Sequence, residues 1–131
     1  MAKEYQSELT VITKAKDLCR YVINATAKSP KQFRFTFVSR LQNLALDILE
    51  NLYRANDTFV TRENLASWGI RLEFQHKSIS EAKILAYVSQ LAMESKALTM
   101  KQFEMISRLT TDVERLTGAW ISSDRKRFKP A

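Results

Sequence analysis

Few residues of this sequence combine the type and spacing that acid–base, nucleophilic or metal chemistry needs. His76 is the single histidine and Cys19 the single cysteine, so no second His or Cys stands at the spacing of a metal site. The two glycines, Gly69 and Gly118, are isolated within expected helices, which excludes a glycine-rich phosphate loop. His76 falls in a polar stretch of an expected helix, where a solvated role is the ordinary one. We therefore expect a protein that is not an enzyme and that uses no metal, cofactor or small-molecule substrate.

Basic side chains form the remaining pattern with chemical meaning. The chain carries 21 Lys and Arg against 14 Asp and Glu, a net charge of +7. Residues 1–40 hold eight of these cations against three acids, and residues 101–131 hold seven against four. Positive charge at both ends of the sequence favours an anionic partner, either a nucleic acid or an acidic protein. The candidate contacts are Lys16, Arg20, Lys28, Lys31, Arg34, Arg40, Arg125, Lys126, Arg127 and Lys129.

Each of these cations has a simpler interpretation on its own, as part of a solvated charged face. As groups they indicate contacts to the phosphate backbone, because the sequence contains no helix-turn-helix or other base-reading motif. Binding of that kind weakens steeply as the salt concentration rises.

Four segments repeat apolar residues every three or four positions, which predicts amphipathic helices that position these cations. We expect these helices over residues 5–27, 37–56, 61–95 and 99–122. Thr61 and Thr99 are the expected N-caps of the last two helices, and Gln102 completes a capping box with Thr99. The polar stretch at residues 75–78 leaves a break in the third helix open, although the pattern favours one long helix.

Four helices joined by short connections predict an all-α fold, an antiparallel four-helix bundle. We expect residues 1–123 to form the bundle and residues 124–131 to form a separate, flexible basic tail. No apolar run approaches the roughly 20 residues that cross a bilayer, and no signal-peptide pattern opens the chain. With a lone cysteine as well, the sequence indicates a cytoplasmic protein that makes no contact with a membrane.

The segment KSPKQFRFTFVSR, residues 28–40, combines four cations with three phenylalanines. Its FRFTF run alternates like a strand, but it stands alone between two helical periods and has no partner strand. Ser29 as N-cap, followed by Pro30 and Gln32, predicts a single helical turn, and Thr36 is the expected N-cap of the next helix. The aromatic side chains of this segment are Phe33, Phe35 and Phe37. We expect at least two of them to close the end of the bundle, which leaves the cations exposed around them.

The second helix has a wider apolar arc than one core requires. Leu46 and Tyr53 lie at about 180° and 160° from Phe37 around this helix, using 100° per residue. The arc is therefore close to half the circumference, against the roughly 100° that faces a single core. Deep burial inside the bundle explains this pattern, and so does a second contact surface for self-association or a protein partner.

Two long runs carry a family resemblance. The runs are KQFRFTFVSRLQNLALDILENLYRAN at residues 31–56 and LAYVSQLAMESKALTMKQFEMISRLTTDVERLTGAWISS at residues 85–123. They resemble the accessory variability determinant (Avd) proteins of diversity-generating retroelements. That family shares its four-helix fold with proteins encoded in ribosomal RNA intervening sequences.

The resemblance implies a non-enzymatic partner of the element's reverse transcriptase. Such a protein is expected to form a homopentameric barrel of four-helix bundles and to bind the polymerase. It would also bind the template RNA, with cDNA as a further ligand, through a positive surface, and would be needed for mutagenic cDNA synthesis. We carry over no site residue from the family, since the chain departs from its usual pattern at Ser29 and Val38. The alternatives are a general RNA- or ribosome-associated four-helix protein and a purely structural oligomeric adaptor.

Overall fold

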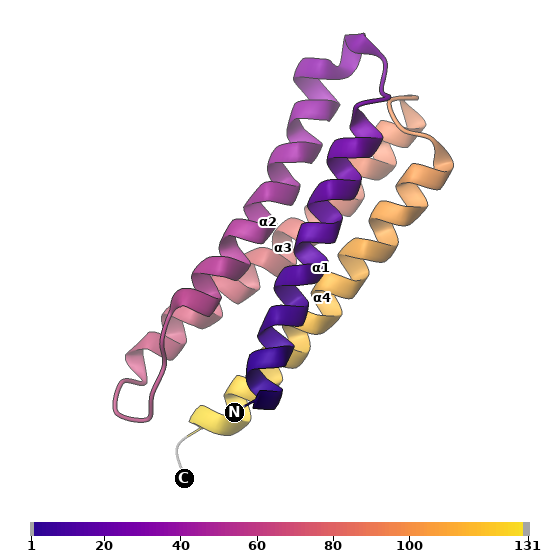
Figure 1. Cartoon of the computed structure of the whole chain (residues 1–131). Coiled ribbons are helices and arrows are strands. Elements are labelled where there is room, and N and C mark those ends of the chain that lie inside the picture. The colour runs from indigo at the N-terminus through magenta and orange to yellow at the C-terminus, as the bar shows by residue number, and fades with distance from the viewer. Residues whose placement is uncertain (1, 130–131) are drawn as a thin grey trace.

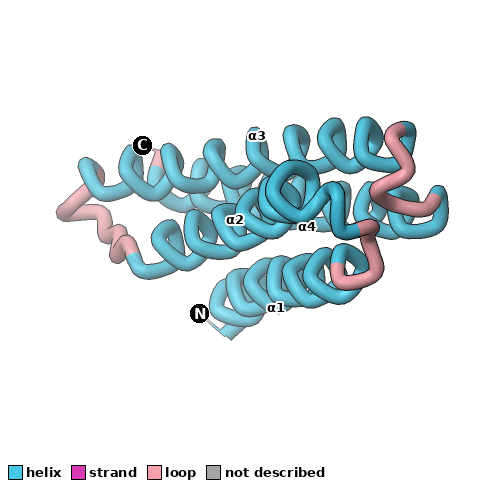
Figure 2. The backbone as a smooth tube through the Cα atoms, turned by 90° about the horizontal axis from the view of Figure 1, so that it is seen from above, coloured by secondary structure: helices cyan, strands magenta, loops and turns pink. Residues whose placement is uncertain are grey.

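The chain folds into four antiparallel helices and contains no extended strand among the residues that the structure describes. The computed structural model describes residues 2–129, with side chains for residues 10–129. The helices are α1 (Ala2–Thr26), α2 (Ser39–Asp57), α3 (Ala66–Glu94) and α4 (Met100–Phe128) (Figure 1). Both α1 and α3 pack against α2 and α4, so α1 and α3 occupy diagonal corners of the bundle (Figure 2). The predicted all-α four-helix bundle is confirmed.

The core is a continuous apolar cluster contributed by all four helices. Its fully buried members include Leu18 of α1, Ile48 of α2, Leu85 of α3 and Ile106 of α4. Each such side chain contributes about 1.5–3 kcal/mol when it leaves water. Within each helix the core residues recur every three or four positions, and this is the periodicity from which the helices were predictable.

The third helix is continuous, as expected, but it begins later than predicted. It starts at Ala66, five residues after Thr61, and no side chain caps its first turn. The Thr61 hydroxyl instead accepts the Asn64 N–H at 3.1 Å within the α2–α3 connection, so the prediction of Thr61 as N-cap is wrong. The polar stretch does not break the helix because Gln75 and Ser78 are buried inside the bundle.

The last helix extends beyond its predicted end at residue 122. It continues to Phe128, so the prediction of a flexible tail from residue 124 is wrong as far as residue 128. The reason is burial: Asp124 is fully enclosed and Phe128 is 5% exposed. The Phe128 ring packs against Trp68 of α3 with 6.2 Å between ring centroids. Residues 130–131 of the predicted tail lie outside the described residues.

The α1–α2 connection contains a helical turn, as predicted, but its caps differ. A 3₁₀ turn, Lys31–Phe33, leads into a π-helical turn, Arg34–Val38, which runs directly into α2. Ser29 donates its hydroxyl to the Ala97 carbonyl at 2.7 Å instead of capping the turn. Thr36 donates to the Phe33 carbonyl and starts no helix, so both predicted N-caps are wrong. Ser29 thereby joins the α1–α2 connection to the α3–α4 connection.

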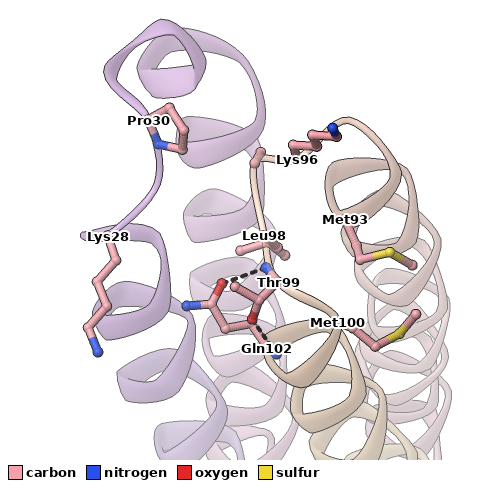
Figure 3. A pocket seen from close by; sticks show the side chains of 9 residues that line it. Lys28, Pro30, Met93, Lys96, Leu98, Thr99, Met100 and Gln102 are labelled. Atoms are coloured by element: carbon pink, nitrogen blue, oxygen red, sulfur yellow. Dashed lines mark hydrogen bonds between the residues drawn. The ribbon is translucent and has the colours of Figure 1, made fainter.

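The predicted capping box at the start of α4 is confirmed. The Thr99 hydroxyl accepts the Gln102 N–H at 3.1 Å. The Gln102 side-chain oxygen accepts the Thr99 N–H at 2.9 Å (Figure 3). This reciprocal pair satisfies two of the donors that every helix start leaves free. The Gln102 side-chain amide also donates to the Ala25 carbonyl at 3.5 Å, which joins the start of α4 to the end of α1.

Candidate nucleic-acid interface

Eight of the ten predicted cations divide between opposite ends of the bundle, so the ten do not form one surface. The segment after α1 lies at one end, and the C-terminus of α4 lies at the other, beside the N-terminus of α1 (Figure 1). Since α4 has 29 residues, these ends are about 43 Å apart at 1.5 Å per residue. We call the first group the loop-end cluster: Lys28, Lys31, Arg34 and Arg40. We call the second group the C-terminal cluster: Arg125, Lys126, Arg127 and Lys129.

The loop-end cluster is exposed and carries no compensating acid of its own. All four of its side chains are exposed, and the sequence has no Asp or Glu from residue 18 to residue 46. The fold also brings Lys96 to this end. Lys28, from the α1–α2 connection, and Lys96, from the α3–α4 connection, line one hollow of about 420 Å³ (Figure 3). Glu94 and Glu104 are the nearest acids in sequence to that connection.

Sequence reasoning missed Lys96 because 68 positions separate it from Lys28. Its backbone is left-handed, with φ of 71°, at a helix end where glycine is the usual residue. That conformation costs a residue with a Cβ about 1–2 kcal/mol. The sequence does contain a signal for Lys96. This lysine lies in the connection between the third and fourth helices, three positions before the Thr99 cap, and antiparallel helices place that connection beside the end of α1.

The three phenylalanines of the FRFTF run have two different environments. Phe33 and Phe37 pack against the core, with 5.8 Å between their ring centroids. Phe35 is 87% exposed. The expectation that at least two of these rings close the end of the bundle is confirmed.

The C-terminal cluster presents three cations, because its fourth member is engaged within the fold. Arg127 donates to the buried Asp124 carboxylate at 2.7 Å, and its guanidinium lies 4.7 Å from the centre of the Phe128 ring. The other three cations are exposed and line a shallow hollow of about 290 Å³ with Ser122: Arg125, Lys126 and Lys129.

Lys16 and Arg20 lie along α1, between the two clusters. Arg20 pairs with Asp17 at 3.2 Å, which reduces the charge it presents. Lys16 borders a groove of about 660 Å³ between α1 and α2, which we call the α1–α2 groove. Its lining residues are Ile12, Lys16, Leu46, Leu49, Glu50, Tyr53 and Asn56.

The wide apolar arc of α2 is not explained by deep burial. Leu46 is 45% exposed and Tyr53 is 59% exposed, and both line the α1–α2 groove. A second apolar surface, which the sequence analysis missed, lies on α3. Ile84, Tyr87 and Leu91 are exposed at the spacing of one helix face, and we call them the α3 stripe. Because α3 is apolar on several sides, its sequence does not distinguish the core face from the outer face.

Among the side chains that the structure describes, two ionisable groups have a shifted pKa, and neither forms a catalytic arrangement. Burial raises the pKa of the Cys19 thiol to about 11, and Arg20 opposes that shift. The Cys19 Sγ donates to the Ala45 carbonyl at 3.2 Å. Burial also raises the pKa of Glu81, with the negative charge of Asp47 adding to the effect. Among residues 10–129, no three His, Cys, Asp or Glu side chains gather into a group that could hold a metal ion.

Comparison with known proteins identifies a likeness of fold. No protein-family model matches the sequence, and no curated protein matches it. A solved structure from Bacteroides thetaiotaomicron, described as a protein of unknown function from the S23 ribosomal protein family, matches with a TM-score of 0.72. The match covers 88% of this chain and 98% of that one at 17% sequence identity. This likeness supports the four-helix fold.

None of the helices between residues 2 and 129 is both long and apolar enough to span a membrane.

Proposed function

We propose that this protein is an accessory factor of a diversity-generating retroelement, binding the element's reverse transcriptase and its template RNA during mutagenic cDNA synthesis. The observation that carries the RNA-binding part is the loop-end cluster, whose four cations are exposed in a stretch without any acid. The retroelement assignment is supported by the resemblance of residues 31–56 and 85–123 to the Avd family. In this proposal the protein is not an enzyme.

The loop-end cluster would act on the phosphate backbone. Lys28, Lys31, Arg34 and Arg40 supply long, flexible cations, and Lys96 adds a fifth from the neighbouring connection. Cations of this kind neutralise phosphates and release counterions, which gives affinity without reading base edges. Template recognition would then depend on RNA shape and on the polymerase held in the same complex.

A ring of identical copies fits the two unlike apolar surfaces. The α1–α2 groove and the α3 stripe are on different sides of the bundle, because α1 and α3 are diagonal. When one surface of a copy meets a different surface of the next copy, the contact is head-to-tail, and it gives a ring when the rotation between neighbouring copies closes. The resemblance implies five copies. A cyclic ring keeps the same end of every copy on one side, so the loop-end clusters would gather around one opening.

The experiment that tests this function is co-purification with the candidate reverse transcriptase and its template RNA, with stoichiometry read by light scattering. We expect a complex that contains all three components and several copies of this chain per polymerase. Recovery of this chain with neither polymerase nor RNA would contradict the proposal. A cheaper test examines the neighbouring genes, where a reverse transcriptase and a template/variable repeat pair are expected, and their absence would also contradict it.

The alternative function is that of a general RNA- or ribosome-associated protein. It is favoured by the solved structure described as belonging to the S23 ribosomal protein family, which has the same fold. This alternative predicts salt-dependent binding to structured RNA in complexes that contain no polymerase. The same co-purification therefore separates the two candidates.

A further inference from the structure

Phe35 is an exposed aromatic ring on a hydrogen-bonded turn. Phe33 and Phe37 are four residues apart and pack against the core, while Phe35 lies between them and is 87% exposed. The turn is fixed at both ends, since the Phe33 N–H donates to the Pro30 carbonyl at 3.0 Å and the Ser39 N–H donates to the Arg34 carbonyl. A backbone held in this way loses little conformational freedom when the ring that it carries binds a partner.

The surroundings of Phe35 indicate what kind of partner it would contact. Its charged sequence neighbours are Lys31 and Arg34, and both line a hollow of about 350 Å³ at the base of the same turn. No acidic residue occurs from residue 18 to residue 46. Isolated exposed apolar residues are common on proteins, but an exposed ring among unopposed cations matches the design of single-strand binding sites. There, cations contact the backbone and an aromatic ring stacks on a base.

We propose that Phe35 stacks on one unpaired base of bound RNA, with Lys31 and Arg34 contacting neighbouring phosphates of the same strand. The inference rests on the proposed RNA-binding function and adds to it a preference for unpaired nucleotides. Bases in loops, bulges and single strands expose the faces that an aromatic ring needs, whereas those in a continuous duplex do not. The loop-end cluster alone would bind duplex and single strand through their phosphates.

The chain contains a matched control for this residue. Phe59 is 78% exposed in the α2–α3 connection, at the opposite end of the bundle (Figure 1). Its sequence neighbourhood carries both signs of charge, with Asp57 and Glu63 as well as Arg62. Phe59→Ala therefore removes a similarly exposed ring from a place where we expect no stacking.

The test compares Phe35→Ala with Phe59→Ala in binding to an unstructured single-stranded RNA and to a blunt-ended RNA duplex. We expect Phe35→Ala to weaken single-strand binding about 5- to 150-fold, as for other stacked bases, and to leave duplex binding unchanged. The salt dependence should stay the same, since no charge is removed. Phe59→Ala should bind like the unaltered protein. Thermal unfolding of both variants should match it too, because neither ring is buried.

Two further variants identify the interaction as stacking. Phe35→Leu keeps an apolar side chain without a ring and should bind as weakly as Phe35→Ala. Phe35→Trp should retain single-strand affinity, and its indole fluorescence should be quenched when RNA is added. Full affinity in Phe35→Leu would overturn the stacking interaction.

The failures are distinguishable. Equal single-strand affinities of the unaltered protein and Phe35→Ala would overturn this inference and leave the proposed function standing. Loss of reverse-transcriptase binding in Phe35→Ala, with RNA binding intact, would make Phe35 a protein contact and overturn it as well. If the unaltered protein binds no RNA, the RNA-binding function fails and this inference fails with it.

Discussion

Arg71 on α3 donates to the carboxylate of Asp124 on α4 at 3.1 Å, and both side chains are almost completely buried. The same carboxylate accepts Gln75 at 3.2 Å and Arg127 at 2.7 Å. Arg71 also donates to the Thr58 carbonyl at 2.8 Å, so one network joins the α2–α3 connection, α3 and the end of α4. This network holds the C-terminal cluster on a folded helix.

Removing Asp124 should destabilise the bundle strongly. Asp124→Ala leaves the Arg71 guanidinium buried without its carboxylate, and such losses cost about 3–5 kcal/mol. Urea unfolding followed by circular dichroism measures the change. The control is Glu50→Ala, which removes the exposed pair between Glu50 and Arg54 at 3.4 Å and should change the free energy of unfolding by less than about 1 kcal/mol. Equal effects of the two substitutions would contradict the role of the network.

The end of α4 also indicates where sequence reasoning stops. The four helices were predictable because their core residues recur every three or four positions. The run DRKRF at residues 124–128 has the composition of a solvated tail, because four of its five side chains are charged. Its place in the fold depends on Arg71 and Trp68, which lie more than 50 positions earlier in the chain. Local periodicity carries no information about such a pairing.

Sequence reasoning about the candidate site had the same limit. The cations and aromatics of residues 28–40 were recognisable from their composition alone. The sequence does not indicate which of the three rings is exposed. Phe35 points away from the core and Phe37 packs against it because of the geometry of one π-helical turn, which local periodicity does not predict. The contribution of Lys96 required the α1–α2 and α3–α4 connections to be adjacent, which the Ser29 hydrogen bond to Ala97 demonstrates.

Glu81 should make the stability of the protein depend on pH. Its pKa is raised from the ordinary value of 4.5, chiefly by burial, so the folded state favours the protonated carboxyl. Folding is therefore strengthened by Glu81 at low pH, and this contribution is lost as the pH rises from 4.5 through the raised pKa. Asn51 donates to Glu81 at 2.5 Å, a bond that a glutamine oxygen can also accept.

The substitution Glu81→Gln isolates this effect. At pH 7 the variant should have a higher melting temperature than the unaltered protein, because it carries no charge to desolvate. The difference should shrink towards zero as the pH is lowered to 4 and below. Asp47→Asn is an informative companion, since it removes the negative charge that adds to the shift in the pKa of Glu81. A difference that grows with acidification would contradict the assignment.

The two basic clusters should contribute unequally to RNA binding. Replacing Lys28, Lys31, Arg34 and Arg40 by glutamine should weaken RNA binding. It should also flatten the plot of log affinity against log salt by about 0.7–0.9 for each phosphate that the variant no longer neutralises. Filter binding over a salt series measures both quantities. The control replaces the three exposed cations of the C-terminal cluster by glutamine: Arg125, Lys126 and Lys129. We expect this variant to lose less RNA affinity and less of the salt slope.

The same pair of variants also tests the solubility interpretation of the charge. If the loop-end substitutions leave both the affinity and the salt slope unchanged, the cations serve solubility and the protein is a structural adaptor. A larger effect from the C-terminal cluster would instead move the RNA-binding surface to the other end of the bundle.

Disrupting either apolar surface should break the ring, and mixing the two variants should restore one contact. Leu46→Glu with Tyr53→Glu places charge in the α1–α2 groove, and Ile84→Glu with Leu91→Glu places charge on the α3 stripe. All four side chains are exposed, so each double variant should fold normally and elute as a monomer.

The groove variant retains its stripe and the stripe variant retains its groove. An equimolar mixture should therefore form a one-to-one dimer and no larger species, because a head-to-tail chain of two such copies has no intact surface left at its ends. Light scattering distinguishes these masses, and Phe59→Glu, at an exposed apolar residue outside both surfaces, should leave the oligomer intact. A groove that pairs with a second groove would give a different pattern: the stripe variant would then assemble like the unaltered protein and the mixture would contain no mixed dimer.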